Sequence, residues 1–163
     1  MTIEFVKIGE QDYKIIKDIY DYYIMNSTAT FHTERISIDE LKEVIINNHQ
    51  KYKSFLIKSD GIICGYCYYS QYKKRQAYDR TAEITVYLKP EYLGKGIGKR
   101  AVQYLEGIAK SQGINVLVGI ITEENHQSIK LFEKLGYEKC AHYKQVGEKF
   151  RKVLDVVAYQ IFL

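Results

Sequence analysis

Hydrophobic and polar positions follow two different periods in the first half of the chain. Residues 3–8 (IEFVKI) alternate and predict a strand, whereas residues 11–25 repeat Ile and Tyr at helical spacing and predict a helix. Residues 37–48 open with Ser-x-x-Glu, a capping box, and predict a second helix. Residues 52–70 predict two strands that are joined by a tight turn at Asp60 and Gly61.

The second half of the chain repeats a strand–helix alternation. A polar loop, residues 71–80, separates the predicted hairpin from the next strand. The continuous apolar run at 114–122 is typical of a strand covered on both faces. The remaining predicted elements are a strand at 81–88, a helix that ends near Gly113, a helix at 125–136, and strands at 137–145 and 152–162. The order βααβββαβαββ predicts one α/β or α+β domain.

A glycine-rich segment, LGKGIGKR at residues 93–100, lies between the strand at 81–88 and the following helix. The first N–H groups of a helix have no intrahelical partner and attract anions, and Lys95, Lys99 and Arg100 add positive charge. We therefore predict a phosphate or pyrophosphate ligand, with a ligand-free glycine connection as the alternative. The spacing matches neither the Walker loop nor the dinucleotide-binding fingerprint.

Size and composition restrict the class of protein. The chain has 163 residues and a formal net charge of only +4, whereas a dedicated nucleic-acid binder usually carries a clustered basic face. The chain begins without an apolar signal core and contains no apolar run of membrane-spanning length. We expect a cytoplasmic protein with neither a nucleic-acid nor a membrane partner.

The cysteines and histidines do not have the spacing of a metal site. Cys64 and Cys67 form a C-x-x-C pair, but there is no second pair and no nearby histidine. We interpret them as buried thiols of one strand, and residues three apart on a strand should point to opposite faces. The histidines are scattered along the chain, so we expect no metal.

Several strings resemble one enzyme family. The stretches VYLKPEYLGKGIGKR (86–100) and NHQSIKLFEKLGY (125–137) are similar to the signature of the GNAT superfamily of N-acetyltransferases. Residues 19–34, 73–88 and 145–160 resemble its phosphinothricin acetyltransferase branch. The resemblance implies a single N-acetyltransferase domain over 1–163, with a central, mixed, mostly antiparallel sheet flanked by helices. It also implies acetyl-CoA as co-substrate and a homodimer.

The resemblance implies roles for particular residues. Glu83, in TAEIT, matches the general base of the family. The positions that match acetyl-CoA contacts are Val86, Tyr87, Leu88, Gly94, Lys95, Gly96, Ile97, Gly98, Lys99 and Asn125. The positions that match the amino-acid substrate pocket are Phe31, Lys73, Arg75 and Tyr78.

The chain departs from the family pattern at positions 93 and 132. Leu93 replaces the usual Gln or Arg near the phosphates, which leaves the main-chain donors in place. Phe132 stands where the superfamily often has Tyr and this branch often has His. The resemblance assigns this position the role of proton donor to the CoA thiolate. Because Phe cannot donate a proton, this role is vacant, filled by another group, or left to solvent.

The implied reaction is transfer of the acetyl group of acetyl-CoA to the α-amine of a small amino acid, such as phosphinothricin or methionine sulfoximine. The amine attacks directly, with Glu83 as general base. Taken alone, Glu83 is also compatible with a strand-end carboxylate paired with Arg80 or a lysine, and residues 73–75 (KKR) with a solvated loop. The alternative functions are acetylation of a different small amine or antibiotic, and a non-catalytic acyl-CoA sensor.

Overall fold

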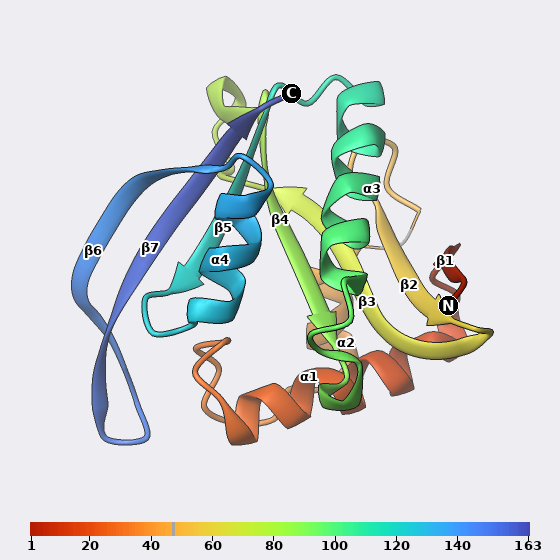
Figure 1. Cartoon of the computed structure of the whole chain (residues 1–163), viewed down its shortest axis with the longest axis horizontal. Helices are drawn as coiled ribbons and strands as arrows, with labels where there is room; N and C mark the ends of the chain where they lie inside the picture. The colour runs from red at the N-terminus through yellow and green to blue at the C-terminus, as the bar shows by residue number, and fades with distance from the viewer. Residues whose placement is uncertain (47) are drawn as a thin grey trace.

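The computed structural model describes residues 1–46 and 48–163 and contains a seven-stranded sheet in the order β1-β2-β3-β4-β5-β7-β6 (Figure 1). Strands β4 and β5 pair in parallel, and the other neighbouring strands pair antiparallel. The strands are β1 (Ile3–Lys7), β2 (Ser54–Ser59), β3 (Ile62–Gln71), β4 (Thr81–Leu88), β5 (Val116–Thr122), β6 (Glu138–Lys149) and β7 (Lys152–Phe162). The predicted order and the mostly antiparallel sheet are confirmed.

Helices cover both faces of the sheet and enclose a core on each side. The helices are α1 (Tyr13–Asn26), α2 (Ile38–Val44), α3 (Ile97–Ser111) and α4 (His126–Lys134), with short 3-10 turns at Glu10–Asp12, Gln76–Tyr78 and Pro90–Tyr92. One core contains the buried faces of α3 and α4, including Leu105 and Phe132. The other contains those of α1 and α2, including Ile16 and Leu41. Burial of these apolar side chains is the main force that holds the layers together.

The hairpin turn and the helix cap that were predicted in the first half of the chain are observed. Asp60 and Gly61 both have positive φ (49° and 80°), as the tight hairpin turn requires. Ser37 caps α2 by accepting the Glu40 N–H at 3.1 Å, and the Glu40 carboxylate accepts the Ser37 N–H at 2.6 Å. The helix ends at Val44 and not at residue 48 as predicted, and position 47 of that range lies outside the described residues.

The prediction that Cys64 and Cys67 point to opposite faces is wrong. The register of β2 and β3 shifts between Ile57 and Lys58, which indicates a β-bulge next to Cys64. The extra residue breaks the two-residue alternation, and both thiols lie fully buried in the core under α3. Burial raises the pKa of both thiols, so they are protonated core side chains, as the prediction of buried thiols required.

The last two strands form a long hairpin that Figure 1 shows extending past the rest of the sheet. β6 runs to Lys149, beyond the predicted end at 145. Phe150 and Arg151 form the turn, and both have positive φ (53° and 59°), which is uncommon for residues other than glycine.

In the described part of the chain, no helix is long and apolar enough to cross a membrane. The same residues contain no group of three or more His, Cys, Asp or Glu that is placed to hold a metal ion.

Candidate functional site

Strands β4 and β5 separate after a short pairing. Their parallel register ends at the pair Glu83–Val118. β4 nevertheless continues to Leu88 and β5 to Thr122, and Figure 1 shows the strands diverging toward these ends. On its other side, β4 remains paired with β3 as far as Leu88. The edge of β4 that faces β5 is therefore open beyond Glu83.

The main chain of Val86 faces this opening. The Lys89 N–H donates to the Cys64 carbonyl at 2.8 Å, so residue 89 directs its main chain toward β3. Main-chain groups alternate between the two neighbours along a strand, so residues 86 and 88 face β5. The Leu88 carbonyl is already bound, because it accepts a hydrogen bond from the Tyr23 hydroxyl of α1. Val86 thus offers a main-chain donor and acceptor in the opening.

The side chain of Tyr87 forms part of the wall on the α1 side. Its ring packs against Tyr20, Tyr23 and Tyr66, with centroids 5.2–5.5 Å apart. Its hydroxyl donates to the Ala29 carbonyl at 3.4 Å. Burial and the neighbouring tyrosines raise the pKa of Tyr87 well above the ordinary value. Tyr87 therefore joins β4 to the segment that follows α1.

The glycine-rich segment forms a turn with open space around its main chain. Gly94 and Gly96 have φ of +72° and +77°, and a Cβ at either position would meet no atom of the described residues within 4 Å. Gly96 is the N-cap of α3, and its carbonyl accepts the Arg100 N–H. The N–H groups of Ile97, Gly98 and Lys99 lie in the first turn and precede the intrahelical bonds. This geometry suits a ligand that approaches the backbone.

The charged side chains of this turn are exposed. Lys95 lies with its ammonium 5.2 Å from the Tyr92 ring centre, a cation–π contact. Lys99 is exposed in the first turn of α3, where its charge adds to that of the helix N-terminus. Leu93 is 39% exposed, so this departure from the family pattern leaves an apolar side chain at the edge of the turn.

Helix α4 packs directly on the start of α3. A Cβ on Gly98 would lie 3.2 Å from Leu131 Cδ2, so glycine permits a close approach of the two helices. Asn125 is the N-cap of α4, and its Oδ1 accepts the Ser128 N–H at 3.3 Å. The cap uses the amide oxygen of Asn125, so its Nδ2 group is a donor that the cap does not require.

Phe132 is buried at the point where β4 and β5 separate. A Cβ on Gly119, the residue after the last position of β5 that pairs with β4, would lie 3.2 Å from the Phe132 ring. The ring also packs edge-to-face on Tyr137, with centroids 4.8 Å apart. Phe132 is therefore a packing residue of the α3–α4 core, and it has no proton to donate.

Glu83 is largely buried on the α1 side of β4, next to the first open position. Among the described residues it forms no ion pair, so the alternative of a pairing with Arg80 or a lysine is not observed. Burial raises the pKa of the Glu83 carboxyl above its ordinary value. A buried carboxylate without a cation is costly for stability and is a feature of catalytic bases.

Sequence reasoning missed Tyr68, which lies beside Glu83. Tyr68 pairs with Thr85 across β3 and β4, and Ser70 pairs with Glu83, so these side chains share one face. Burial raises the pKa of Tyr68, and the Glu83 charge raises it further. The chain has 16 tyrosines, so composition alone does not single out this one. Only the pairing register of β3 and β4 identifies it.

The structure brings together part of the predicted acceptor site, in the loop before β4. The Lys73 ammonium lies 5.3 Å from the ring centres of both Tyr72 and Tyr78. The two rings contact edge-to-face at 5.6 Å. Arg75 is exposed in the same loop, as the N-cap of the 3-10 turn.

Phe31 lies apart from this loop. Its ring packs against Gly147 of β6, where an added Cβ would come within 2.3 Å of Phe31 Cε2. Figure 1 places the segment after α1 near one end of β4 and the loop between β3 and β4 near the other. The predicted acceptor residues therefore form two groups at different ends of the strand that carries Glu83.

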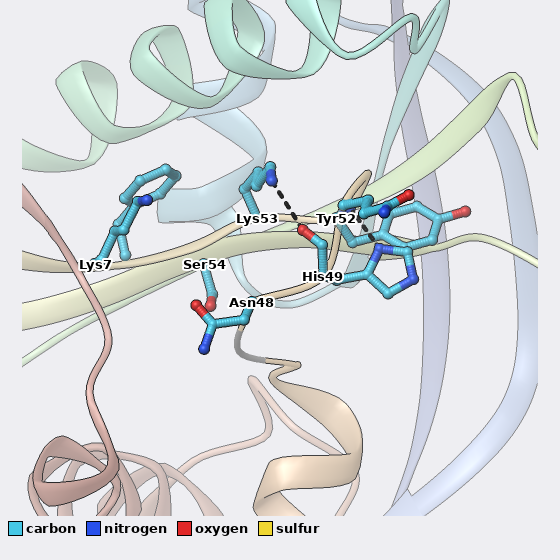
Figure 2. A pocket seen from close by; sticks show the side chains of 8 residues that line it. Lys7, Asn48, His49, Tyr52, Lys53 and Ser54 are labelled. Atoms are coloured by element: carbon cyan, nitrogen blue, oxygen red, sulfur yellow. Dashed lines mark hydrogen bonds between the residues drawn. The ribbon is translucent and has the colours of Figure 1, made fainter.

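A cavity of about 270 Å³ lies elsewhere, next to the start of β2. Figure 2 shows Lys7, Lys53 and Ser54 around it, with the Lys53 ammonium bonded to the His49 carbonyl at 2.8 Å. The His49 ring accepts the Lys51 and Tyr52 N–H groups. None of the predicted site residues lines this cavity.

The opening and the glycine turn together fit acetyl-CoA. The positive-φ glycines leave room for a pyrophosphate at the main chain, and the N-terminus of α3 favours its charge. The open edge of β4 offers main-chain groups of Val86 to an extended amide-containing chain. An anion site at one end and a strand-like edge at the other match the two chemically distinct parts of this molecule.

Comparisons with known proteins agree with this geometry. The model of the Acetyltransferase (GNAT) family matches residues 16–137. The L-methionine sulfoximine/L-methionine sulfone acetyltransferase of Pseudomonas aeruginosa is 30% identical over 95% of this chain and 91% of its own. The phosphinothricin N-acetyltransferase of Streptomyces viridochromogenes is 30% identical over 91% of this chain and 81% of its own.

A solved structure extends the similarity to the whole chain. The phosphinothricin acetyltransferase of Sinorhizobium meliloti, in complex with acetyl-CoA, is 29% identical with a TM-score of 0.93, over 100% of this chain and 89% of its own. With the family match, this similarity establishes the enzyme class and the co-substrate. The chain belongs to the GNAT family and is an acetyl-CoA-dependent N-acetyltransferase related to the phosphinothricin acetyltransferases.

Proposed function

We propose that this enzyme transfers the acetyl group to the α-amine of a small amino acid, with phosphinothricin and methionine sulfoximine as the model substrates. The observation that carries the proposal is Glu83, a largely buried carboxylate without an ion-pair partner among the described residues. It lies on β4 at the last position paired with β5, where the strand edge opens. The relatives that act on these amino acids match nearly the whole chain.

Glu83 acts as the general base in this proposal. An α-amine has a pKa near 8, so only about a tenth of it is neutral at pH 7. The attacking amine must lose its proton, and the Glu83 carboxylate accepts that proton directly or through water. Burial raises the pKa of Glu83 toward that of the amine, which makes the carboxylate a better base.

Main-chain groups position the acetyl donor. The Val86 N–H faces the opening, where it stabilises the negative charge that develops on the thioester oxygen during attack. The glycine turn and the start of α3 hold the pyrophosphate. The residues assigned to acetyl-CoA are Val86, Tyr87, Leu88, Gly94, Lys95, Gly96, Ile97, Gly98, Lys99 and Asn125. Within this set, Leu88 contributes its main-chain N–H, which faces the opening. The main chain of Tyr87 faces β3 and its side chain packs toward α1, so Tyr87 contributes as part of the wall.

The acceptor side uses the loop before β4. The guanidinium of Arg75 is exposed and suits bidentate binding of the amino acid's carboxylate. Lys73 and Tyr78 stiffen this loop through their cation–π contact. Phe31 borders the site from the other end of β4, on the segment that Tyr87 contacts.

Water protonates the departing thiolate in this proposal, because Phe132 is an apolar ring packed on Gly119. A thiol pKa of about 8.5 means that the thiolate is a stable leaving group near neutral pH.

The apolar Phe132 at the proton-donor position is also the observation that favours the second candidate function, a non-catalytic acyl-CoA sensor. Glu83 argues against a sensor, since a protein that only binds the acyl donor does not need a largely buried carboxylate that lacks an ion pair within the described part of the chain.

The deciding experiment measures thiol release from acetyl-CoA by the purified protein. The acceptor panel contains L-phosphinothricin, L-methionine sulfoximine, ordinary amino acids, a polyamine and an aminoglycoside. Fast release with the first two supports the proposal, whereas fast release only with the polyamine or the aminoglycoside assigns a different acceptor. Acetyl-CoA binding without release by any amine supports the sensor.

We also propose that the enzyme is a homodimer. β6 is an edge strand, and the hairpin of β6 and β7 exposes apolar side chains. The exposed fractions are 52% for Tyr143, 58% for Val146, 59% for Phe150 and 56% for Val153. Such a surface is suited to association with a second copy of this chain.

A further inference from the structure

Lys149 is a charged side chain in an unusual environment. It is 4% exposed, and no other lysine, arginine, aspartate or glutamate appears among the buried residues that the structure describes. Its ammonium donates to the Thr30 carbonyl at 2.8 Å and lies 5.2 Å from the Phe150 ring centre. No carboxylate contacts it within the described part of the chain. A buried ammonium with one neutral acceptor costs free energy, so this placement needs another reason.

The neighbours of Lys149 on the hairpin contact the same segment. Gly147 and Lys149 are two residues apart on β6 and therefore share a face, and Lys152 lies directly opposite Lys149. Gly147 leaves room for the Phe31 ring, which a Cβ there would approach to 2.3 Å. Lys152 forms an ion pair with Glu124, whose carboxylate also accepts the Thr28 hydroxyl. One face of the hairpin thus contacts the chain from Thr28 to Phe31.

The segment from Thr28 to Phe31 is in turn connected to β4. The Thr30 hydroxyl and the Tyr20 hydroxyl form a hydrogen bond of 2.7 Å. The Tyr20 ring packs edge-to-face on Tyr87, and the Tyr87 hydroxyl donates to the Ala29 carbonyl. The contacts therefore run without a break from Lys149, through Thr30 and Tyr20, to the strand that carries Glu83.

We propose that Lys149 is a positioning residue, which fixes the segment Thr28–Phe31 and through it the Phe31 side of the acceptor site. This inference rests on the proposed function for the identity of the acceptor, but not for the contacts themselves. Because the Lys149 ammonium is buried under Thr30, it acts through this segment and does not contact the acceptor. Its loss should weaken acceptor binding and leave the glycine turn, at the start of α3, unaffected.

The test compares Lys149→Met with Lys149→Arg, and uses Lys144→Met on exposed β6 as the matched control. The Met variant keeps the length of the side chain and removes its donor, whereas the Arg variant restores a donor. We expect Lys149→Met to raise the KM for the best acceptor about tenfold, because one charge-assisted hydrogen bond is lost. The KM for acetyl-CoA should stay within twofold of wild type. Lys149→Arg should recover most of the acceptor affinity, and Lys144→Met should match the wild type.

A second readout does not require turnover. Amide hydrogen exchange of residues 28–31 should become at least about tenfold faster in Lys149→Met, while exchange in residues 97–100 stays unchanged. If no amine is acetylated by the wild type, the proposed function fails, and the exchange data still decide the role of Lys149. Wild-type exchange in Lys149→Met, or an equal rise of both KM values, overturns the inference.

Should Lys149→Met fail to fold, Gly147→Ala provides the second variant. The added methyl displaces the Phe31 ring without removing a charge or a hydrogen bond. An increased acceptor KM with an unchanged acetyl-CoA KM supports the role of this contact surface. An unchanged acceptor KM overturns it.

Discussion

At the scale of single residues, the proposed catalytic position on β4 carries a side chain that is unfavourable for stability. Glu83 is a largely buried carboxylate without a cation among the described residues, and burial raises its pKa. A raised pKa in the folded protein means that folding is favoured less at neutral pH than below the unfolded pKa, because the charged form is penalised only in the fold. The charge of Glu83 therefore lowers the stability of the fold at the position where the proposed chemistry needs a base.

Glu83→Gln should lower kcat by about 10²–10⁴-fold and leave the KM for acetyl-CoA within twofold, because only proton transfer is lost. For the wild type, kcat/KM should fall as pH decreases through the raised pKa of Glu83, where the carboxylate becomes protonated. That limb should disappear in the variant, which should also melt at a temperature equal to or above that of the wild type. Steady-state kinetics from pH 5 to 9 and a melting curve check both statements. A wild-type pH profile in the variant would rule out Glu83 as the base.

Arg75→Ala should raise the KM for the amino-acid acceptor about tenfold or more, because a charge-assisted hydrogen bond contributes about 1.5–3 kcal/mol. The KM for acetyl-CoA should change less than twofold, since Arg75 lies in the loop before β4 and the glycine turn follows that strand. Steady-state kinetics with both substrates varied measure the difference. The exposed Arg35 provides the matched control, as Arg35→Ala. Equal effects of Arg75→Ala on both KM values would contradict a carboxylate clamp.

At the scale of elements, the sequence predicts the order and type of strands and helices because each has a strong local signal. The Ser37–Glu40 capping box, the Asp60–Gly61 turn and the strand at 81–88 are all observed as expected. Predictions from the sequence fail where the pairing between strands decides which way a side chain points. The bulge beside Cys64 depends on the register with β2, and no local pattern indicates it.

In the candidate site, too, the features that depend on local sequence can be predicted and those that depend on strand pairing cannot. The glycine turn is local, so its conformation follows from Gly94 and Gly96 themselves. The position of Glu83 beside Tyr68, by contrast, depends on the pairing of β3 with β4. The contact of Phe31 with Gly147 joins residues that are far apart in the sequence, which periodicity cannot reveal.

The turn before α3 offers a test at this scale. Gly96→Ala places a Cβ at φ +77°, a conformation that costs an L residue about 1–2 kcal/mol, although none of the described atoms lies within 4 Å of the new one. We expect the KM for acetyl-CoA to rise several-fold, with the acceptor KM unchanged. Gly107→Ala, in the interior of the same helix and equally free of clashes, should stabilise the protein by about 0.5–1 kcal/mol and leave both KM values unchanged. Equal kinetics of the two variants would argue against a ligand at the turn.

At the scale of the whole molecule, the hairpin of β6 and β7 has two different faces. Gly147, Lys149 and Leu154 face the body of the enzyme, where Leu154 is 3% exposed. Val153 belongs to the opposite face, since it pairs with Glu148, and it is 56% exposed. Val146 lies in the irregular stretch of β6 between Tyr143 and Gly147 and is 58% exposed. The inner face is explained by contacts within one chain, whereas the outer face carries apolar side chains that a monomer leaves in water.

The double variant Val146→Lys/Val153→Lys should therefore convert a homodimer to a monomer, because like charges on an interface between identical copies meet one another. Light scattering coupled to size-exclusion chromatography measures the mass, which for one chain is 19.1 kDa. Ile62→Lys, a substitution at the first residue of β3, which is 60% exposed, is the matched control and should remain dimeric. A dimeric double variant would place the interface elsewhere, and a monomeric wild type would contradict the homodimer.

If the double variant is a monomer with wild-type kinetics, each active site is complete within one chain. A loss of acceptor affinity alone would instead mean that association supports the segment on which Phe31 lies.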